Sequence, residues 1–217
     1  MRRPPRLVVA NWVGIGYRVF LNGPYDMQKS EQVHIELQKA ERAVESMRNS
    51  ATIEEFEESW KSFLHRIERT WNRILNHYQK SPKWNGWQAN ILKLRKNDPL
   101  LSYLINARGA DEHTGDDIVT RFQGGISITS SDGGPIRIKS FESNGQGLRF
   151  EGSSNSVFSF FSSSVEPKDI TNRGRIYHVP HSHLGEPIVD ATAVHLAEMG
   201  LFFYSEFIAN VEKTFVG

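Results

Sequence analysis

The sequence contains no cysteine, which excludes disulfides, thiol catalysis and cysteine-ligated zinc. It also lacks a long apolar run. The stretch that follows the N-terminal arginines, residues 7–13, is too short for a signal peptide or a membrane span. We therefore expect a cytoplasmic protein that makes no contact with a membrane.

An excess of one charge sign is also missing, because 26 lysines and arginines stand against 25 aspartates and glutamates. No global field is expected to draw the chain onto nucleic acid, so binding to RNA would need a local patch. The basic clusters at residues 2–6 and 93–96 are small. We interpret both as solvated surface or flexible chain, because phosphate binding usually needs several converging cations.

The remaining composition is that of a globular protein, with 38% hydrophobic residues and 13 phenylalanines for a core. Two stretches carry apolar residues at alternating steps of four and three, which predicts two amphipathic helices. The first starts near Lys29, and the second at Thr52, where Glu55 completes a capping box. We interpret both apolar stripes as core, and they consist of Val33, Leu37, Ala40, Val44 and Met47, then Phe56, Trp60, Phe63, Ile67, Trp71, Ile74 and Tyr78.

Two further helices follow. The third is marked by Trp84, Trp87, Ile91 and Leu94. The fourth starts at Asp98-Pro99, where the aspartate caps the helix and the proline suits its first position. The fourth helix buries Leu101, Leu104 and Ile105 and ends near His113, before Gly115. Four helices with short connections predict an antiparallel bundle.

Short β-type runs then replace the helical pattern. The strand candidates are Ile118–Phe122, Ile126–Thr129, Ile136–Ile138, Leu148–Phe150, Val157–Phe161 and Tyr177–Val179, with turns at Asp132–Gly134 and Ser143–Gly145. Asp190 or Thr192 caps a last helix, whose stripe is Val194, Ala197, Leu201, Tyr204, Ile208, Val211 and Phe215. We predict an α+β fold: an N-terminal strand segment 1–26, a four-helix bundle-like region 27–115, a small antiparallel β-region 116–189, and a C-terminal helix 190–217 packed on the rest.

One short motif carries chemistry, and it lies at the end of the fourth helix. Arg108 is four residues after Leu104, so it projects from the apolar face of that helix. A guanidinium there is costly unless it is paired or reached by water. Either Glu112, one turn later, neutralises it, or this face lines a polar cleft. Gly109 beside it permits a close backbone approach or a bend.

Arg108, four intervening residues and His113 resemble the arginine–histidine signature of the HEPN family (higher eukaryotes and prokaryotes nucleotide-binding). The helical order over residues 28–115 is similar to that family as well. The resemblance implies a homodimeric bundle and, in catalytic members, a metal-independent ribonuclease whose arginine and histidine come from two protomers. Active members usually carry a polar residue, often Asn, directly after the arginine, and here that position is Gly109.

The resemblance implies a specific chemistry on RNA, with no cofactor. His113 would act as general acid or base on the 2′-hydroxyl, since imidazole titrates near neutral pH. Arg108 would bind the phosphate and stabilise the charge of the transition state. Asp111 or Glu112 would orient the imidazole. Nucleases of this type often come with a neutralising partner protein.

Two alternatives stay open. The first is a non-catalytic interaction or scaffold protein, in which Arg108 pairs with Glu112 inside the helix and His113 lies near the helix C-terminus, where a cation is favoured. The second concerns His178, His181 and His183, whose spacing could place two imidazoles on a zinc ion. Pro180 interrupts the strand between them, so a polar loop is the favoured interpretation of that segment.

Overall fold

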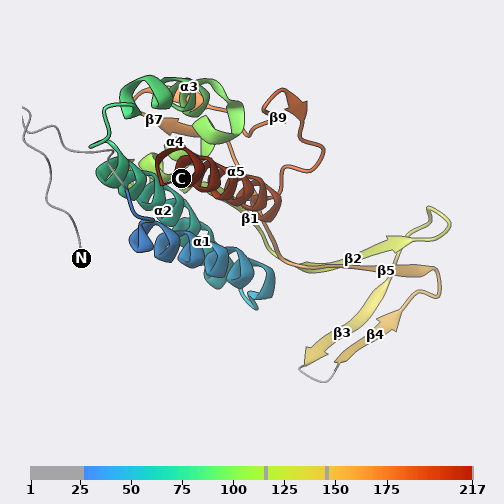
Figure 1. Ribbon diagram of the computed structural model, residues 1–217. Coiled ribbons are helices and arrows are strands. Elements are labelled where there is room, and N and C mark those ends of the chain that lie inside the picture. Colours follow the sequence, from blue (N-terminus) through green and yellow to red (C-terminus); the bar gives the residue numbers. More distant parts are fainter. Residues whose placement is uncertain (1–26, 115–116, 145–146, 217) are drawn as a thin grey trace, which may run out of the picture.

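The computed structural model describes residues 27–114, 117–144 and 147–216. It has the predicted α+β architecture, with four helices, an antiparallel β-region and a long closing helix (Figure 1). The strands predicted within residues 1–26 lie outside the described residues. Among those that are described, no helix combines the length and apolarity needed to span a membrane.

The helices begin and end close to the predicted positions. They are α1 (Glu31–Asn49), α2 (Ile53–Tyr78), α3 (Trp84–Asn97), α4 (Pro99–Thr114) and α5 (Ala193–Phe215). The predicted Thr52 cap is present, since its hydroxyl accepts a hydrogen bond from the Glu55 amide. The Glu55 carboxylate also reaches back, but it accepts from the Ala51 amide, one residue before the cap that a capping box would use. Thr192 caps α5 by accepting from the amide of His195, 3.4 Å away.

The core lies between α1, α2, α4 and α5. The α1 stripe is buried throughout, and the α2 stripe is buried except for the half-buried Phe56. The closing helix packs on α1, α2 and α4, and α1, α2 and α5 lie side by side in Figure 1. Gly200 of α5 makes this packing close, because a Cβ there would lie 2.6 Å from Leu104 Cδ1. The amphipathic stripes therefore determine which helix faces meet.

Six strands form one nested antiparallel hairpin that projects away from the helices (Figure 1). β1 (Val119–Phe122) pairs with β6 (Ser164–Pro167) at its base. β2 (Gly125–Ser130) pairs with β5 (Ser156–Phe161), and β3 (Ile138–Asn144) pairs with β4 (Gly147–Gly152) at its far end. We call residues 125–161 the β-arm.

The third predicted strand was misplaced. Ile136 lies outside any strand, and β3 starts at Ile138 and includes Asn144, which was predicted to lie in a turn. The reason is the preceding turn. The Asp132 carboxylate accepts hydrogen bonds from Ser130, Asn155 and the Gly134 amide, which together lower the pKa of Asp132 to about 2. This turn holds the chain away from the ladder until Ile138.

Two small hairpins lie against the helices. They consist of β7 (Ile170–Asn172) with β8 (Arg175–Tyr177), and β9 (Ser182–His183) with β10 (Glu186–Pro187). Each closes with a two-residue turn whose residues all have positive φ, Arg173-Gly174 and Leu184-Gly185, as the twist of a tight hairpin requires. The strand predicted at Tyr177–Val179 lies two residues earlier, since β8 covers Arg175–Tyr177.

Candidate functional site

Arg108 lies at the edge of the α4 core face, and its side chain is 32% exposed. One terminal nitrogen donates to both Glu112 carboxylate oxygens, at 2.6 and 2.5 Å. The neutralisation by Glu112 that the sequence offered as one of two outcomes is therefore present. The site is not sealed, however, because water and ligands reach both side chains. The Nε atom of Arg108 is buried and has no hydrogen-bond partner among the described residues.

An imidazole lies next to this pair, and it belongs to His65 on α2. Its Nδ1 is 3.3 Å from a Glu112 oxygen, and its Nε2 is 3.8 Å from an Asp111 oxygen. The two carboxylates predicted to orient an imidazole thus flank one from another helix. Nothing in the spacing of residues 105–113 indicates His65, because the contact depends on how α2 and α4 pack.

Further ion pairs extend this cluster along α2. Lys61 lies 2.9 Å from Asp111 and 3.2 Å from Glu57, and Glu57 lies 2.7 Å from Arg121 at the base of the hairpin. The hydrogen bond with Asp111 raises the pKa of Lys61, against the effect of burial. We call this set the α2–α4 charge network, and it comprises Glu57, Lys61, His65, Arg108, Asp111, Glu112, Asp117 and Arg121.

The second predicted catalytic residue, His113, belongs to the last turn of α4, but its side chain lies outside the described residues. Its meeting with Arg108 stays a prediction. The structure does bring together three of the four predicted site residues, Arg108, Asp111 and Glu112, on one stretch of α4 that faces His65.

Gly109 is the close-approach glycine that the sequence allowed for. Asn172 of β7 packs against it, and a Cβ at position 109 would lie 2.5 Å from the Asn172 amide nitrogen. That amide is buried and donates to the Asn106 side chain at 2.9 Å. An asparagine amide from β7 therefore occupies the space where a side chain at position 109 would lie, directly after Arg108 in α4.

Gly109→Ala is expected to destabilise the fold by about 1 kcal/mol, because overpacking costs about 1–3 kcal/mol and alanine recovers up to about 1 kcal/mol of helix propensity. Urea unfolding of the purified protein measures this change. In an Asn172→Ala background the clash is gone, so the same substitution should become neutral or stabilising. A destabilisation of equal size in both backgrounds would contradict the packing explanation.

The three histidines of residues 178–183 do not converge. His178 bonds Asp169 at 2.6 Å on the surface, whereas the buried His183 bonds Asp98 at 2.9 Å. Across residues 27–114, 117–144 and 147–216, no group of three or more histidines, aspartates and glutamates is arranged to hold a metal ion. The hydrogen bonds to separate carboxylates give these two histidines different roles, one on the surface and one in the core.

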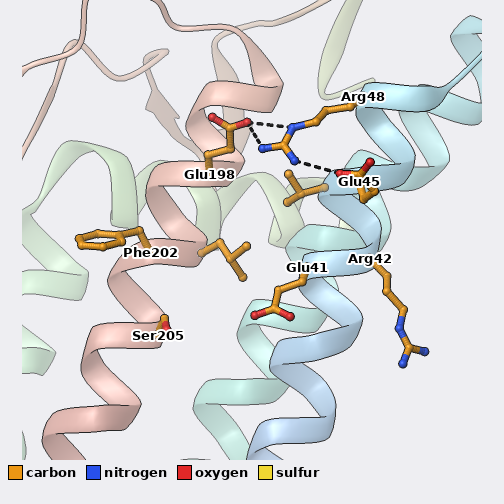
Figure 2. A pocket seen from close by; sticks show the side chains of 9 residues that line it. Glu41, Arg42, Glu45, Arg48, Glu198, Phe202 and Ser205 are labelled. Atoms are coloured by element: carbon orange, nitrogen blue, oxygen red, sulfur yellow. Dashed lines mark hydrogen bonds and ion pairs between the residues drawn. The ribbon is translucent and has the colours of Figure 1, made fainter.

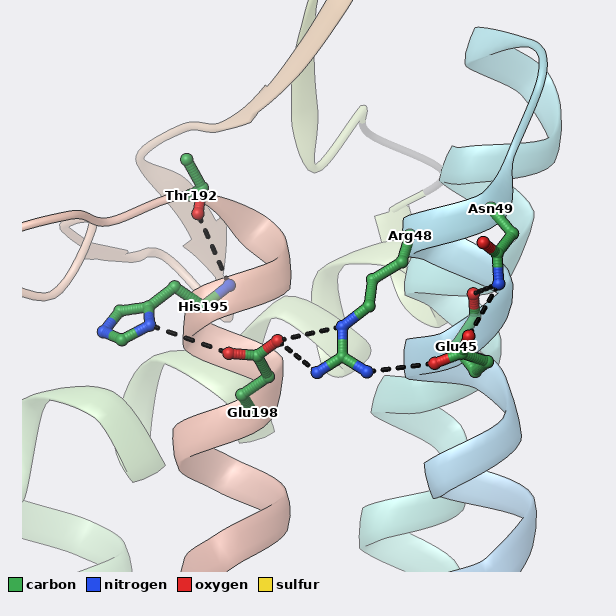
Figure 3. Close-up of polar contacts among 6 residues, drawn as sticks. All are labelled: Glu45, Arg48, Asn49, Thr192, His195 and Glu198. Atoms are coloured by element: carbon green, nitrogen blue, oxygen red, sulfur yellow. Dashed lines mark hydrogen bonds and ion pairs between the residues drawn. The ribbon is translucent and has the colours of Figure 1, made fainter.

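A groove of about 670 Å³ separates α1 from α5, on helices other than the one that carries Arg108 (Figure 2). Its rim carries Glu41, Glu45 and Glu198 against Arg42 and Arg48. Arg48 is fully engaged, since it donates to Glu198 at 3.1 Å and to Glu45 at 3.0 Å (Figure 3). Acidic groups therefore outnumber the available cations, and this groove does not favour a phosphate ligand.

No family model, curated protein or solved structure matches this chain. The HEPN resemblance therefore remains a hypothesis that depends on the motif and on the helical order.

Proposed function

We propose that this protein is a HEPN-like, metal-independent ribonuclease that binds an RNA phosphate at the α2–α4 charge network. The observation that supports this most strongly is the position of Glu112, between the Arg108 guanidinium and the His65 imidazole. A guanidinium can bind a phosphate through two parallel hydrogen bonds, and an imidazole can transfer a proton. Both side chains are about one-third exposed, so a substrate can reach them.

The proposed step uses the nucleophile that RNA itself carries. The 2′-hydroxyl oxygen attacks the adjacent phosphorus, the bond to the 5′-oxygen breaks, and the products are a 2′,3′-cyclic phosphate and a 5′-hydroxyl. With His65 Nδ1–H donating to Glu112, Nε2 accepts the hydroxyl proton. The leaving oxygen takes a proton from a second acid, for which His113 or water is suited. Arg108 stabilises the charge that grows on the phosphate.

Substrate binding must exchange partners, because Glu112 occupies Arg108 in the free protein. An RNA phosphate would draw the guanidinium away and leave Glu112 with His65 alone. A Glu112 carboxylate that accepts from His65 Nδ1–H would hold the imidazole in the tautomer whose Nε2 can accept the hydroxyl proton. The same carboxylate thus opposes binding and assists the chemical step. Glu112→Gln should consequently bind RNA more tightly while cleaving it more slowly, so KM and kcat would fall together.

The test is cleavage of labelled single-stranded RNA by the purified full chain in EDTA. Arg108→Ala and His65→Ala are expected to lower the cleavage rate by at least about 100-fold. His113→Ala, in parallel, determines whether the histidine of the HEPN-like motif also participates. Matched controls are Arg42→Ala and His181→Ala, because both side chains are exposed and neither forms a side-chain ion pair or hydrogen bond with a described residue.

A folded wild-type protein with no cleavage activity would overturn the proposal, as would activity that persists in Arg108→Ala. Circular dichroism of each variant separates loss of chemistry from loss of fold.

The second candidate is a non-catalytic interaction protein, and the β-arm favours it. Phe160 of β5 is 70% exposed and Phe161 is 53% exposed, and phenylalanines on a projecting hairpin are typical of a protein contact. In this alternative the α2–α4 charge network only joins two helices, and the substitutions in it would change stability without affecting any turnover.

A further inference from the structure

The β-arm has an apolar face that nothing in the described chain covers. Side chains of directly paired residues project from the same face of a two-stranded ribbon. The pairs Ile126–Phe160 and Ile128–Phe158 therefore form one face of the β2–β5 ribbon. The other face carries Ser127–Ser159 between Gly125–Phe161 and Thr129–Val157, so its apolar side chains are separated by a serine pair. At the far end Phe141 pairs with Phe150. Phe150 meets Phe158 edge to face at 4.8 Å, which joins the two ribbons.

This face is not a core of its own. Every β-arm residue outside positions 143–146 is at least partly exposed, whereas the helices enclose a fully buried cluster. The exposed portions of Phe141 and Phe160, 42% and 70% of the residue, together leave on the order of 200 Å² of apolar surface in water. The half-buried Ile126, Ile128 and Phe158 extend this area. Two-stranded ribbons are marginal without a covered face, so a partner that covers this face would stabilise the β-arm.

The charges of the β-arm identify the kind of partner. It carries three cations and three anions: Arg137, Lys139, Arg149, Asp132, Glu142 and Glu151. They neutralise one another locally, since Lys139 lies 2.5 Å from Glu151 and Glu142 pairs across the ladder with Arg149. A nucleic acid or an anionic membrane would require a basic surface. A neutral apolar face carries no repulsion toward an identical copy of itself.

We propose that the β-arm is a self-association surface, on which the apolar faces of two copies pack against each other across a two-fold axis. Antiparallel sheets pack face to face at about 10 Å with interdigitated side chains, and an isologous contact needs one self-complementary patch. The homodimer that the HEPN resemblance implies forms through its bundle. This contact uses the β-arm and does not depend on the proposed nuclease activity.

The patch is small, so the dimer is expected to be weak, with a dissociation constant on the order of micromolar. Sedimentation equilibrium of the full chain over roughly 1–200 µM should show a monomer–dimer transition. Phe160→Ser and Ile126→Lys, which alter the apolar face from each of its strands, should weaken the dimer by at least about tenfold. Phe161→Ser is the matched control on the opposite face, with an expected change of less than about threefold.

A wild-type protein that stays monomeric at the highest concentration would overturn the proposal. So would equal effects of Phe160→Ser and Phe161→Ser. Co-sedimentation with phosphatidylcholine vesicles tests the other occupant. Three results together would assign the face to a membrane instead: the wild type co-sediments with the vesicles, it does not self-associate, and Phe160→Ser no longer co-sediments. Thermal unfolding of the helical body checks that each variant is folded.

Discussion

Replacing Asp98 with alanine is expected to destabilise the folded state by about 3–5 kcal/mol. Asp98 is buried, at 5% exposure. One carboxylate oxygen accepts from the Leu101 amide and from His183 Nδ1, each at 2.9 Å, and the other accepts from the Leu184 amide at 2.7 Å. Alanine removes the cap of α4, worth about 1 kcal/mol by itself, and leaves a buried imidazole and an amide without an acceptor.

Urea or guanidinium unfolding measures this loss, and Asp190→Ala is the matched control. Asp190 also accepts from a backbone amide, that of Thr192, but it is exposed. Its removal should cost less than about 1 kcal/mol. Equal losses for the two aspartates would show that burial and the contact with His183 contribute nothing.

The Asp98 carboxylate also predicts that the folded state loses stability at acidic pH. Burial raises the pKa of Asp98, but the hydrogen bonds from His183, Leu101 and Leu184 outweigh it and hold this pKa below its usual value. A depressed pKa in the folded state stabilises the protein above the unfolded pKa of about 3.9, and the stabilisation is lost as the pH falls through the folded value. The stability difference between the wild type and Asp98→Asn should therefore shrink as the pH falls from about 6 to about 3.

Local patterns in the sequence predicted the elements that depend on neighbours in the chain. The apolar stripes predicted α1, α2 and α5, and the Thr52 and Asp98 caps predicted where α2 and α4 begin. Each of these signals depends on residues within four positions of one another. The order of helices and strands, and therefore the α+β class, followed from the same short-range chemistry.

Contacts between distant residues could not be predicted. Asp98 was expected to be a cap alone, yet it also holds His183, which is 85 residues away. The imidazole beside Glu112 belongs to His65, and only the packing of α2 on α4 brings them together. The nested pairing of β1 to β6 could not be predicted either. Each strand pairs with a partner whose position depends on the turns between the two.

Arg95 shows how such a contact reverses an interpretation. The cluster at residues 93–96 was interpreted as solvated surface, and for Arg95 this is wrong, since only 8% of the residue is exposed. Its guanidinium lies 4.1 Å above the Trp71 ring, donates to Glu68 at 2.8 Å, and donates to the Tyr204 hydroxyl. Burial raises the pKa of Tyr204 above its usual value, and the hydroxyl accepts the bond from Arg95 through an oxygen lone pair.

Arg95→Ala is therefore expected to cost about 3–5 kcal/mol, because it leaves the largely buried Glu68 and the buried Tyr204 hydroxyl without a partner. Arg95 on α3 connects α2 to α5, so the loss should appear as a lower midpoint of global unfolding. Arg95→Lys keeps the charge but lacks the planar guanidinium with its several donors, so we expect a loss of stability intermediate between those of the wild type and Arg95→Ala. The adjacent Lys96→Ala is the control, since Lys96 is exposed and should change stability by less than about 0.5 kcal/mol.

The double variant Arg95→Met with Glu68→Leu determines the origin of this loss. If the main cost is an unpaired buried carboxylate, removing both charges should restore part of the stability lost in Arg95→Met alone. Purely additive losses would show that Glu68 and Arg95 are not coupled. The stabilisation would then come from the guanidinium stacked on Trp71 and bonded to the Tyr204 hydroxyl. In a Trp71→Leu background the Arg95→Met substitution should in that case cost less free energy of unfolding than in the wild type.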